Sequence, residues 1–456
     1  MDVYGSLYRS VIHPAWESVL RGRPTLARLE QLRRSEWRSR EELDAFQFGE
    51  LTKLLRHAEA HVPYFGMLFA EAGVRARDVK TVDDMRKIPV LTRPLASSTL
   101  AERTSTAPPF PTIKKSTSGS SGNPLVFAYD TGSEYWRQAM KLRGYEWAGY
   151  RIGEPSLHYW GPAPRPLPPW HKRAKVGLDR AIKRETYLDC VTQNEEALRA
   201  TVATIKKKKP KVILAYAQSG GALARFIVEN RLRDWKDIHV ICGAEPLFPN
   251  DRAAMREAFG PGVFNTYGCR ETMLIATECA EHDGLHVSME NILVEVIVKD
   301  EKGVERAAKP GEVGELVITD LHNFGAPLIR YVNGDLAMAG DETTCGCGRK
   351  LARISSVEGR VTEALTDGKG GRVSGIYFCT LMVPLATSIR RFQAVQHKDK
   401  SITLKIVPTA AYSDDVAKVL QSNVERALPG VPLAIQLVDS IPAAASGKGR
   451  PVVVER

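Results

Sequence analysis

Apolar residues early in the chain recur with the spacing of a helix. Leu51, Leu54, Leu55 and Ala58 lie three or four positions apart, which places them on one helical face, and Pro63 in "HVPYF" ends the pattern. We expect this region to form a helical cap that packs through its apolar face.

Between about residues 190 and 300, helical segments alternate with short apolar runs rich in β-branched residues. The runs are "KVILAY", "DIHVICGAE" and "GVFNTYG", and small or polar residues follow each of them. This alternation predicts an α/β sheet whose binding sites lie at the carboxyl ends of its strands.

Two regions of different character follow. The alternating segments "ILVEVIV", "GELVITDL" and "PLIRYVNGDLA", with turn signals between them, predict a smaller β-rich subdomain. Toward the C-terminus, "SITLKIV", a helical pattern from Asp414 to Ala427 and "LAIQLVD" predict a small α+β domain. We therefore divide the chain into an N-terminal domain, residues 1–359, and a C-terminal domain, residues 360–456.

Length and composition agree with this division. A chain of 456 residues with 43% hydrophobic residues can bury the cores of two domains. No apolar run reaches the roughly 18 residues of a membrane helix, and "MDVYGSLYRSVIHPAW" lacks the pattern of a signal peptide. We expect a globular, soluble, cytoplasmic protein without a membrane partner.

Net charge adds little to these predictions. The formal charge is +11, but the basic residues are spread among 53 acidic ones, which argues against a nucleic-acid partner. The densest basic run, Lys206 to Lys209, precedes Pro210 and "VILAY", as at a solvated helix end that leads into a buried strand. A nucleic-acid-binding protein remains an alternative, and it predicts affinity that falls steeply with salt.

A proline-rich segment interrupts the α/β region. "GPAPRPLPPWHKRAK" has five prolines within Gly161 to Trp170, which predicts an extended excursion over the surface, as an insertion or a lid.

Seven cysteines, an odd number without any sign of secretion, argue against a disulfide framework. "TTCGCGRKL" brings Cys345 close to Cys347, and "ECAEHDGLH" offers Cys279 with His282 and His286. Two thiolates with an imidazole or a third thiolate suit tetrahedral zinc, although C-x-C is tighter than the usual zinc pairs. The alternative is a group of buried, reduced thiols.

The segment "KKSTSGSSGNPLVFAYD", residues 114 to 130, offers many hydrogen-bond donors in a glycine-containing loop. Such a loop suits phosphate oxygens, because its hydroxyls and backbone N–H groups are free to donate. The Walker pattern ends in Gly-Lys-Ser/Thr, and the dinucleotide pattern is Gly-x-Gly-x-x-Gly. The loop matches neither, because its Gly119 and Gly122 are followed by Asn123 and Pro124. Taken alone, it could also be a flexible linker.

Five segments in order resemble the adenylate-forming enzymes, in particular the phenylacetate–coenzyme A ligase-like branch, which includes capsule-biosynthesis-type relatives. They are "STSGSSGNP", "NTYGCRE", "GELVITDLHNFGAPLIRYVNGDLA", "VEGR" and "IPAAASGKGRPVV". "HAEAHVPYF" and "IPVLTR" are similar to the N-terminal region of this branch. The resemblance implies a large multi-subdomain N-terminal α/β domain, a small mobile α+β C-terminal domain, and activation of a carboxylate with ATP and Mg²⁺.

The resemblance also implies the nucleotide contacts. It places the β- and γ-phosphates of ATP on the loop formed by Ser116, Thr117, Ser118, Gly119, Ser120, Ser121 and Gly122. The base and ribose are expected at Gly243, Ala244, Glu245, Tyr267, Gly268 and Asp335, with Tyr267 against the adenine and Asp335 on the ribose hydroxyls. Core packing for Tyr267 and turn chemistry for Asp335 are the alternatives.

Catalytic roles follow in the same way. Glu271 is expected to hold Mg²⁺, and Arg270 stands where most relatives have a threonine that meets the α-phosphate. A guanidinium can contact phosphate more strongly than a hydroxyl. Lys448 on "SGKGR" is expected to enter the site when the C-terminal domain closes, and Arg360 matches the hinge arginine, although the acidic residue that often follows it is absent.

For the metal, the resemblance favours His286 over His282 as the fourth ligand beside Cys279, Cys345 and Cys347, in a closed structural zinc site. The carboxylate pocket is expected between "VILAYAQSGG" and "GAEPL", where Tyr216, Gln218 and Ser219 combine an aromatic face with polar groups. These residues suit an aryl or small polar acid.

The sequence thus predicts an enzyme that forms an acyl-adenylate and then transfers the acyl group, with coenzyme A as the expected acceptor. An amine, a carrier protein or a sugar is an equally consistent acceptor. A second alternative, motivated by Arg270 and the altered hinge, is a degenerate scaffold that binds ATP without catalysis. The sequence is also compatible with a homodimer.

Overall fold

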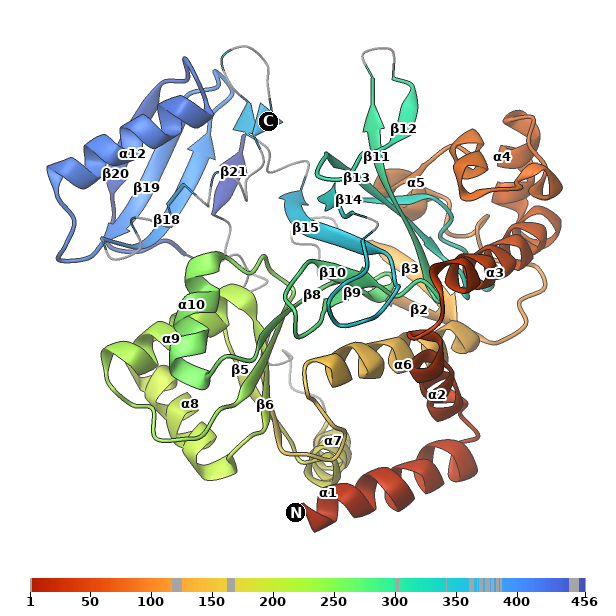
Figure 1. Cartoon of the computed structure of the whole chain (residues 1–456), viewed down its shortest axis with the longest axis horizontal. Helices are drawn as coiled ribbons and strands as arrows, with labels where there is room; N and C mark the ends of the chain where they lie inside the picture. Colours follow the sequence, from red (N-terminus) through yellow and green to blue (C-terminus); the bar gives the residue numbers. More distant parts are fainter. Residues whose placement is uncertain are drawn as a thin grey trace.

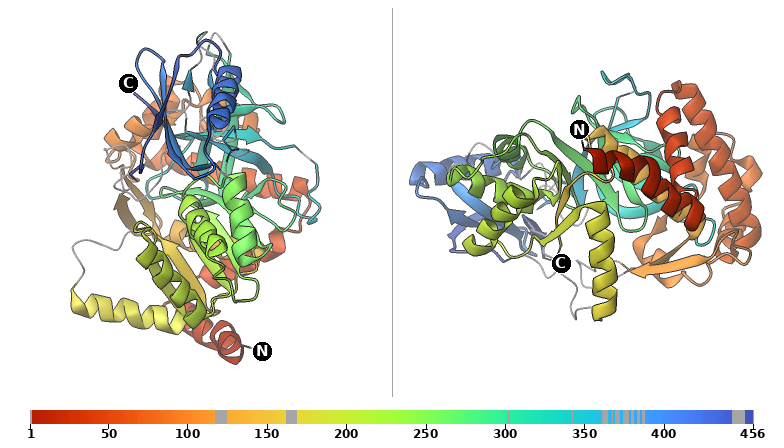
Figure 2. Two further views of the ribbon diagram at one scale, coloured as in Figure 1. Left: turned by 90° about the vertical axis from the view of Figure 1, so that its left-hand side faces the viewer. Right: turned by 90° about the horizontal axis from the view of Figure 1, so that it is seen from below.

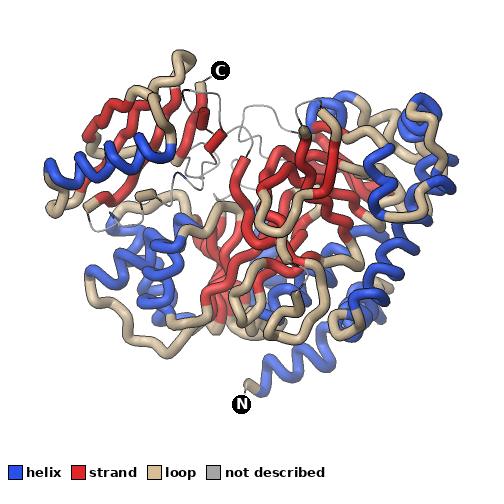
Figure 3. The backbone as a smooth tube through the Cα atoms, turned by 45° about the horizontal axis from the view of Figure 1, so that its top comes forward, coloured by secondary structure: helices blue, strands red, loops and turns tan. Residues whose placement is uncertain are grey.

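The structure is a computed structural model and shows a large N-terminal domain beside a smaller C-terminal one (Figure 1). The described residues are 2–116, 125–161, 169–300, 303–341, 343–360, 365–366, 368, 372–373, 378, 381–382, 385, 388–442 and 451–455. Strands lie at the centre of the large domain and helices lie around them (Figure 3). The predicted fold class, α/β with a small α+β C-terminal domain, is confirmed.

One mixed sheet of thirteen strands organises the large domain. Its order is β12-β11-β13-β14-β15-β10-β9-β8-β7-β6-β4-β5, with β1 paired to β14. Strands β5, β4, β6, β7 and β8 run parallel to one another, whereas β8 and β9 are antiparallel. Strand β8 (Val263–Cys269) is therefore the place where the sheet changes from parallel to antiparallel.

The other strands of this sheet are β1 (Leu91–Thr92), β4 (Ser156–Trp160), β5 (Glu185–Asp189), β6 (Val212–Tyr216), β7 (His239–Gly243), β9 (Met273–Glu278), β10 (Leu285–Val287), β11 (Ile292–Lys299), β12 (Glu305–Ala307), β13 (Val313–Asp320), β14 (Tyr331–Ala339) and β15 (Arg353–Arg360). Two hairpins stand apart from it, β2 (Thr112–Ser116) with β3 (Val126–Asp130) and β16 (Leu365–Thr366) with β17 (Arg372–Val373).

The described helices of the large domain are α1 (Val3–Leu7), α2 (Thr25–Ser35), α3 (Arg40–His61), α4 (Pro63–Glu71), α5 (Arg93–Ser98), α6 (Thr131–Trp147), α7 (Trp170–Lys183), α8 (Glu195–Lys208), α9 (Ala217–Glu229) and α10 (Pro249–Phe259). Two π-helical turns, η1 (Tyr8–Ile12) and η2 (Ala15–Leu20), follow α1, and the 3₁₀ turns η3 (Ala76–Asp78) and η4 (Val82–Lys87) follow α4. Among the described helices, none combines the length and apolar character that a membrane span requires.

The predicted helical cap is confirmed in α3 and α4. A capping box between Ser39 and Glu42 begins α3, because the serine accepts from the Glu42 N–H and the glutamate accepts from the Ser39 N–H. Leu51, Leu54 and Leu55 are buried with the aromatic residues of α4 in one cluster. Pro63 ends the helical pattern as predicted and also begins α4, since proline is tolerated in the first turn of a helix.

The predicted parallel strands are also present. β6, β7 and β8 carry "VILAY", "HVICG" and "VFNTYGC", and α8, α9 and α10 pack against them in one apolar cluster. The basic run Lys206 to Lys209 ends α8 and leads into the buried β6, as predicted.

The proline-rich segment is partly corrected by the structure. Residues 162–168 lie outside the described residues, but Trp170 to Lys183 form a helix, so the extended conformation expected through "WHKRAK" is wrong. All five prolines precede Trp170, and Pro169 is the N-cap of α7, so none of them disrupts its hydrogen bonds.

The C-terminal domain has the expected α+β architecture. Helix α12 spans Asp414–Ala427, as predicted, and its sheet has the order β20-β19-β18-β21. The strands are β18 (Ile389–Gln396), β19 (Ile402–Pro408), β20 (Leu433–Leu437) and β21 (Val452–Val454). Phe248, next to α10 of the large domain, is buried in the apolar cluster of this domain. The two domains therefore share an apolar contact.

Candidate active site and metal centre

The candidate active site lies where the parallel strands end, beside the strand at which the sheet changes direction. Tyr216 ends β6 opposite Gly243, which ends β7, and Tyr267 lies in the second half of β8. Parallel strands bring their carboxyl ends to one edge of a sheet, so segments far apart in the sequence meet there. The α/β pattern alone predicted this edge.

Tyr267 and Asp335 are in direct contact. The Tyr267 hydroxyl donates to Asp335 Oδ2 at 2.6 Å, and Asn333 Nδ2 donates to the same oxygen at 2.9 Å. Burial, together with the Asp335 carboxylate, raises the pKa of Tyr267 well above its usual value, so the hydroxyl keeps its proton and remains a donor. The Tyr267 ring lies in the main apolar core.

Glu271 is a buried carboxylate between two donors. Its Oε1 accepts from Arg93 Nη1 at 2.9 Å and from the Tyr331 hydroxyl at 3.0 Å. The side chain of Glu271 is only 4% exposed, and Arg93 compensates the charge that burial would otherwise disfavour. Arg93 ends the motif "IPVLTR", but nothing local in the sequence indicates a partner 178 positions away.

Arg270 is exposed on the turn between β8 and β9. Burial raises the pKa of Tyr216 to about 12, and the cation of Arg270 acts against this rise. Burial also raises the pKa of Tyr129 on β3 to about 12, again with Arg270 opposing it. Arg270 therefore lies within electrostatic reach of the pocket strand β6 and of the hairpin that carries the predicted phosphate loop.

The segment after β7 has an unusual backbone. Ala244 has a φ of +65°, in the left-handed region that non-glycine residues rarely occupy, and such strain is common at functional sites. A Cβ atom on Gly243 would lie 2.9 Å from Thr266 Oγ1, so a larger residue there would collide with β8. Glu245 Oε2 accepts from the Gln218 backbone N–H at 3.1 Å, which connects this segment to the predicted pocket.

The presence of a glycine at position 268 also has a local structural reason. The register between β8 and β9 shifts at Tyr267 and Gly268, and a Cβ on Gly268 would approach Met273 O to 2.1 Å. Only glycine lets the two strands come this close.

The predicted pocket has an aromatic wall and a polar group. The Tyr216 and Trp160 rings meet edge to face, with centroids 4.7 Å apart. Gln218 Nε2 is buried and has no hydrogen-bond partner among the described residues, and Ser219 is buried beside it in α9. A buried amide N–H without a partner suits a polar group of a ligand. Trp160 was not among the predicted pocket residues, since it lies on a different strand.

Several predicted residues fall outside the described residues, namely Thr117, Ser118, Gly119, Ser120, Ser121, Gly122 and Lys448. Ser116 is exposed at the end of β2, opposite Val126 of β3. Arg360 ends β15, and its backbone pairs with that of Asp335 on β14.

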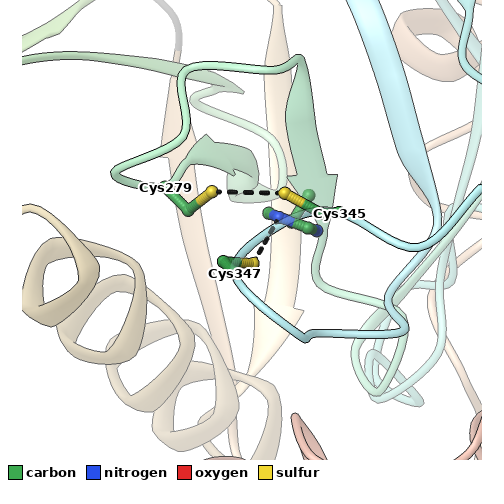
Figure 4. Close-up of side chains that lie close together, drawn as sticks. Cys279, Cys345 and Cys347 are labelled. Carbon is green, nitrogen blue, oxygen red and sulfur yellow. Dashed lines mark hydrogen bonds between the residues drawn. The ribbon is translucent and has the colours of Figure 1, made fainter.

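The predicted metal ligands converge. One ligand atom from each of Cys279, His286, Cys345 and Cys347 lies within 4.8 Å of the others. Cys279 follows β9, His286 lies in β10, and Cys345 and Cys347 come from the segment between β14 and β15. Figure 4 shows the three cysteine side chains close together. His282 instead contacts Glu278, so the preference for His286 agrees with the geometry.

Distances within this cluster fit tetrahedral zinc. Cys279 Sγ and Cys345 Sγ are 3.7 Å apart, and Cys347 Sγ lies 3.4 Å from His286 Nε2. Zinc bonds of about 2.3 Å to sulfur and about 2.0 Å to nitrogen would place neighbouring tetrahedral ligands roughly 3.5 to 3.8 Å apart. Burial, aided by Arg349 and Arg353, lowers the pKa of His286 to about 4, so its imidazole is neutral, as a metal ligand must be.

The same sulfur separation excludes a disulfide, whose S–S bond is about 2.05 Å. The six described cysteines are all free, as predicted.

The surroundings of the cluster connect it to the helical cap. Arg349 lies two residues beyond Cys347, pairs with Glu36 at 3.0 Å, and stacks on the rings of Trp37 and Trp147. The cluster thus joins the neighbouring strands β9, β10 and β15 of the sheet to the N-terminal helices.

Comparisons with known proteins agree with this fold. Residues 365–455 match the family model of the CapK C-terminal domain. The chain is 25% identical over 333 residues to phenylacetate-coenzyme A ligase of Thermus thermophilus, covering 72% of each protein. It is 23% identical over 344 residues to protein CapK of Staphylococcus aureus, covering 74% of this chain and 73% of CapK.

Solved structures show the same architecture over nearly the whole chain. 2-Hydroxyisobutyryl-CoA ligase in the postadenylation state, in complex with R3-HIB-AMP, has a TM-score of 0.73 at 20% identity and covers 92% of this chain and 91% of its own. In its thioesterification state the same ligase gives a TM-score of 0.57 at 19% identity, covering 91% and 90%. The chain is therefore a homologue of phenylacetate–coenzyme A ligase and CapK, with a CapK-type C-terminal domain and the fold of the adenylate-forming ligases.

Proposed function

We propose that this protein activates a carboxylic acid with ATP, forms an acyl-adenylate, and transfers the acyl group to coenzyme A. The observation that carries the proposal is the contact between Tyr267 and Asp335 beside Glu271, at the carboxyl end of the parallel strands. Homologues of this chain are phenylacetate–coenzyme A ligases, and the structural neighbours include acyl-adenylate complexes.

In the first half-reaction, a carboxylate oxygen of the acid attacks the α-phosphorus of ATP. An O–P bond forms, the bond to the bridging oxygen breaks, and pyrophosphate leaves with the electron pair. The protein must hold both reactants in line and stabilise the charge that develops, which makes positioning and electrostatics its main contributions. In the second half-reaction, the sulfur of coenzyme A attacks the carbonyl carbon and AMP leaves.

Asp335 is proposed to accept hydrogen bonds from the ribose hydroxyls. Tyr267 and Asn333 both donate to Oδ2 of this carboxylate, which fixes its orientation. A carboxylate held in advance loses less conformational freedom when the nucleotide binds.

Glu271 is proposed to contribute an oxygen ligand to Mg²⁺, which when bound would neutralise phosphate charge. Arg93 and Tyr331 hold the carboxylate from Oε1, and we assign Arg93 a positioning role through Glu271. Arg270 is proposed to contact phosphate, because its exposed cation acts on both Tyr129 and Tyr216. The roles of the phosphate loop and of Lys448 rest on their motifs.

An aryl or small polar acid is the proposed substrate class. The edge-to-face pair of Trp160 and Tyr216 offers an aromatic wall, and Gln218 Nε2 offers an unused donor among the described residues.

We also propose that Cys279, His286, Cys345 and Cys347 hold a structural zinc ion. Support comes from the two ligand separations, which match the edges of a tetrahedron, and from four protein ligands that leave no position for water. The ion would stabilise the link between β9, β10 and the segment before β15.

The test of the enzymatic proposal is ATP–pyrophosphate exchange with Mg²⁺ across aromatic, hydroxylated and short aliphatic acids, without an acceptor. Exchange that depends on one acid would support adenylation and identify the acid. Addition of coenzyme A, an amine or a sugar would then identify the acceptor. ATP binding without exchange for any acid would favour the degenerate scaffold instead.

A further inference from the structure

Two helical segments expose an unusual number of large apolar side chains. One is α7, and the other, which we call the N-terminal helical segment, consists of α1, η1 and η2 over residues 3–20. Trp170 is 79% exposed and Val3 is 76% exposed. The other large apolar side chains exposed on these two segments are Tyr4, Leu7, Val11, Trp16, Val19, Leu20, Val176, Leu178 and Ile182.

Helix α7 has no buried residue over its 14 residues, and it extends away from the body of the protein (Figure 2). With a period of 3.6 residues, one of its faces carries Trp170, Ala174, Leu178, Ala181 and Ile182. The opposite face carries Lys172, Arg173, Arg180 and Lys183. The single acidic residue, Asp179, pairs with Lys183 at 2.9 Å. An apolar face with tryptophan and a basic polar face are typical of helices that lie in a membrane interface.

The N-terminal helical segment presents a second apolar stripe. Val3, Leu7, Val11, Trp16 and Leu20 are spaced by four or five residues. Two π-helical turns, with their i to i+5 hydrogen bonds, have a wider turn than an α-helix and keep such a spacing on one face. The other side of the segment is anchored on the protein by buried Tyr8 and His13.

The two segments that carry these stripes are in contact. The Tyr4 hydroxyl donates to the Ile182 carbonyl at 2.6 Å, and Arg184 pairs with Asp2 at 2.6 Å. The N-terminal helical segment therefore lies against the C-terminal end of α7, and both views of Figure 2 show the two close together. We call the two together the α7 surface.

We propose that the α7 surface binds the protein peripherally to an anionic lipid bilayer. Its apolar stripes would enter the interface, and Lys172 and Arg173 of α7 would contact lipid phosphates, since Arg180 stacks on the Tyr187 ring and Lys183 pairs with Asp179. Charge complementarity favours an anionic bilayer over a second copy of this chain, because docking two copies through α7 would bring like charges together. The proposal departs from the expectation of no membrane partner, which rested on the lack of a spanning segment.

Helix α8 shows that a basic helix alone does not carry this inference. It is also 14 residues long and ends in Lys206, Lys207 and Lys208. Its apolar residues, however, are buried in the core of the α/β region. In α7, by contrast, basic side chains accompany an apolar face on which Trp170 is 79% exposed and Leu178 is 64% exposed.

Flotation of the full-length protein with vesicles tests the proposal. Vesicles of phosphatidylcholine with about 30% phosphatidylglycerol should bind the protein, and binding should fall as NaCl rises, whereas phosphatidylcholine alone should bind it much more weakly. Trp fluorescence should shift to shorter wavelength with the anionic vesicles only. Absence of binding, or equal binding to both vesicles, would overturn the proposal.

Two variants test the residues. Lys172→Gln with Arg173→Gln should weaken binding to the anionic vesicles roughly 30-fold, at about fivefold for each of the two charges removed. Trp170→Ser with Leu178→Ser should weaken it at least about tenfold. All four side chains are exposed, so thermal unfolding should stay unchanged.

The matched control is Lys206→Gln with Lys207→Gln on α8, which removes the same charge elsewhere and should leave most of the binding intact. Equal loss in the α8 and α7 charge variants would overturn the proposal, because general charge would then account for binding. Light scattering supplies a second check: a dimer in the wild type that the Trp170→Ser, Leu178→Ser variant abolishes would assign the α7 surface to a protein interface instead.

Discussion

The Cys/His cluster and the candidate active site use the same sheet in opposite ways. In the cluster, four potential ligand atoms lie within 4.8 Å of one another. In the candidate active site, Asp335 and Glu271 are held by separate sets of neighbours, Tyr267 with Asn333 for the first and Arg93 with Tyr331 for the second.

This difference teaches how a structural site is told from a reactive one. A structural metal site is closed, because every ligand position is taken by the protein. A reactive site fixes its groups around a space that the substrate must enter, and it holds them from behind through other side chains. Variants of the cluster should therefore change stability first, and variants of the candidate active site should change activity first.

The strongest test of the reactive side is Lys448→Ala. Loss of a cation that stabilises the developing charge should lower the adenylation rate by about 10³-fold, or ~4 kcal/mol, with an unchanged unfolding curve. Pyrophosphate exchange measures the rate. Lys418→Ala, an exposed lysine of the same domain, is the control and should keep full activity. Normal exchange in Lys448→Ala would remove this residue from the mechanism.

For the structural side, Cys345→Ala should remove about one zinc ion per chain. Loss of the metal should lower the free energy of unfolding by on the order of 3 kcal/mol, because binding energy at such a site is folding energy. Metal analysis and urea unfolding measure the two effects. Cys242→Ala, a buried cysteine outside the cluster, should keep the metal and lose only ~1 kcal/mol. A stable, metal-free wild type would establish buried thiols.

Asp335→Asn should affect nucleotide binding with little change in stability. One hydrogen-bonding oxygen and a charge are lost, so KM for ATP should rise roughly 30-fold, or ~2 kcal/mol. Steady-state kinetics over a range of ATP concentrations measure it, and Asp415→Asn on the exposed face of α12 is the control. An unchanged KM would mean that Asp335 has only a structural role in its turn and does not contact the nucleotide.

The smallest effect is expected for Tyr267→Phe. The ring remains in the core, but Asp335 keeps only Asn333 of its two described side-chain donors to Oδ2, so KM for ATP should rise about fivefold, or ~1 kcal/mol. Tyr159→Phe is a matched control, because its buried hydroxyl has no hydrogen-bond partner among the described residues. Equal effects of the two variants on KM would contradict a positioning role for the Tyr267 hydroxyl.

Much of the fold followed from local patterns. The bounds of α12 and the burial of "VILAY" in β6 agree with prediction, because both depend on the spacing of apolar residues over one element. The helix at Trp170 was missed, since five nearby prolines suggested an extended chain while all of them lie before the helix begins.

Sequence patterns predicted many individual residues of the candidate site but not the contacts between them. The four residues of the Cys/His cluster could be predicted to lie together because their residue types and short spacings are themselves a signal. The role of Arg93 could not be predicted from its motif, because its partner Glu271 is 178 positions away. Trp160 was missed for the same reason, since strand order alone brings β4 beside β6.

The sequence by itself determined the class of the fold, the order of its elements and the residue types that can bind phosphate, oxygen-ligated metal and zinc. These depend on periodicity and side-chain chemistry, which are local properties. Only the tertiary structure decided which groups meet, as in the contact of Cys279 with Cys345 across 66 positions, and which apolar faces remain uncovered, as on α7. Both depend on the pairing of distant segments, because burial and electrostatic partners are properties of the assembled chain.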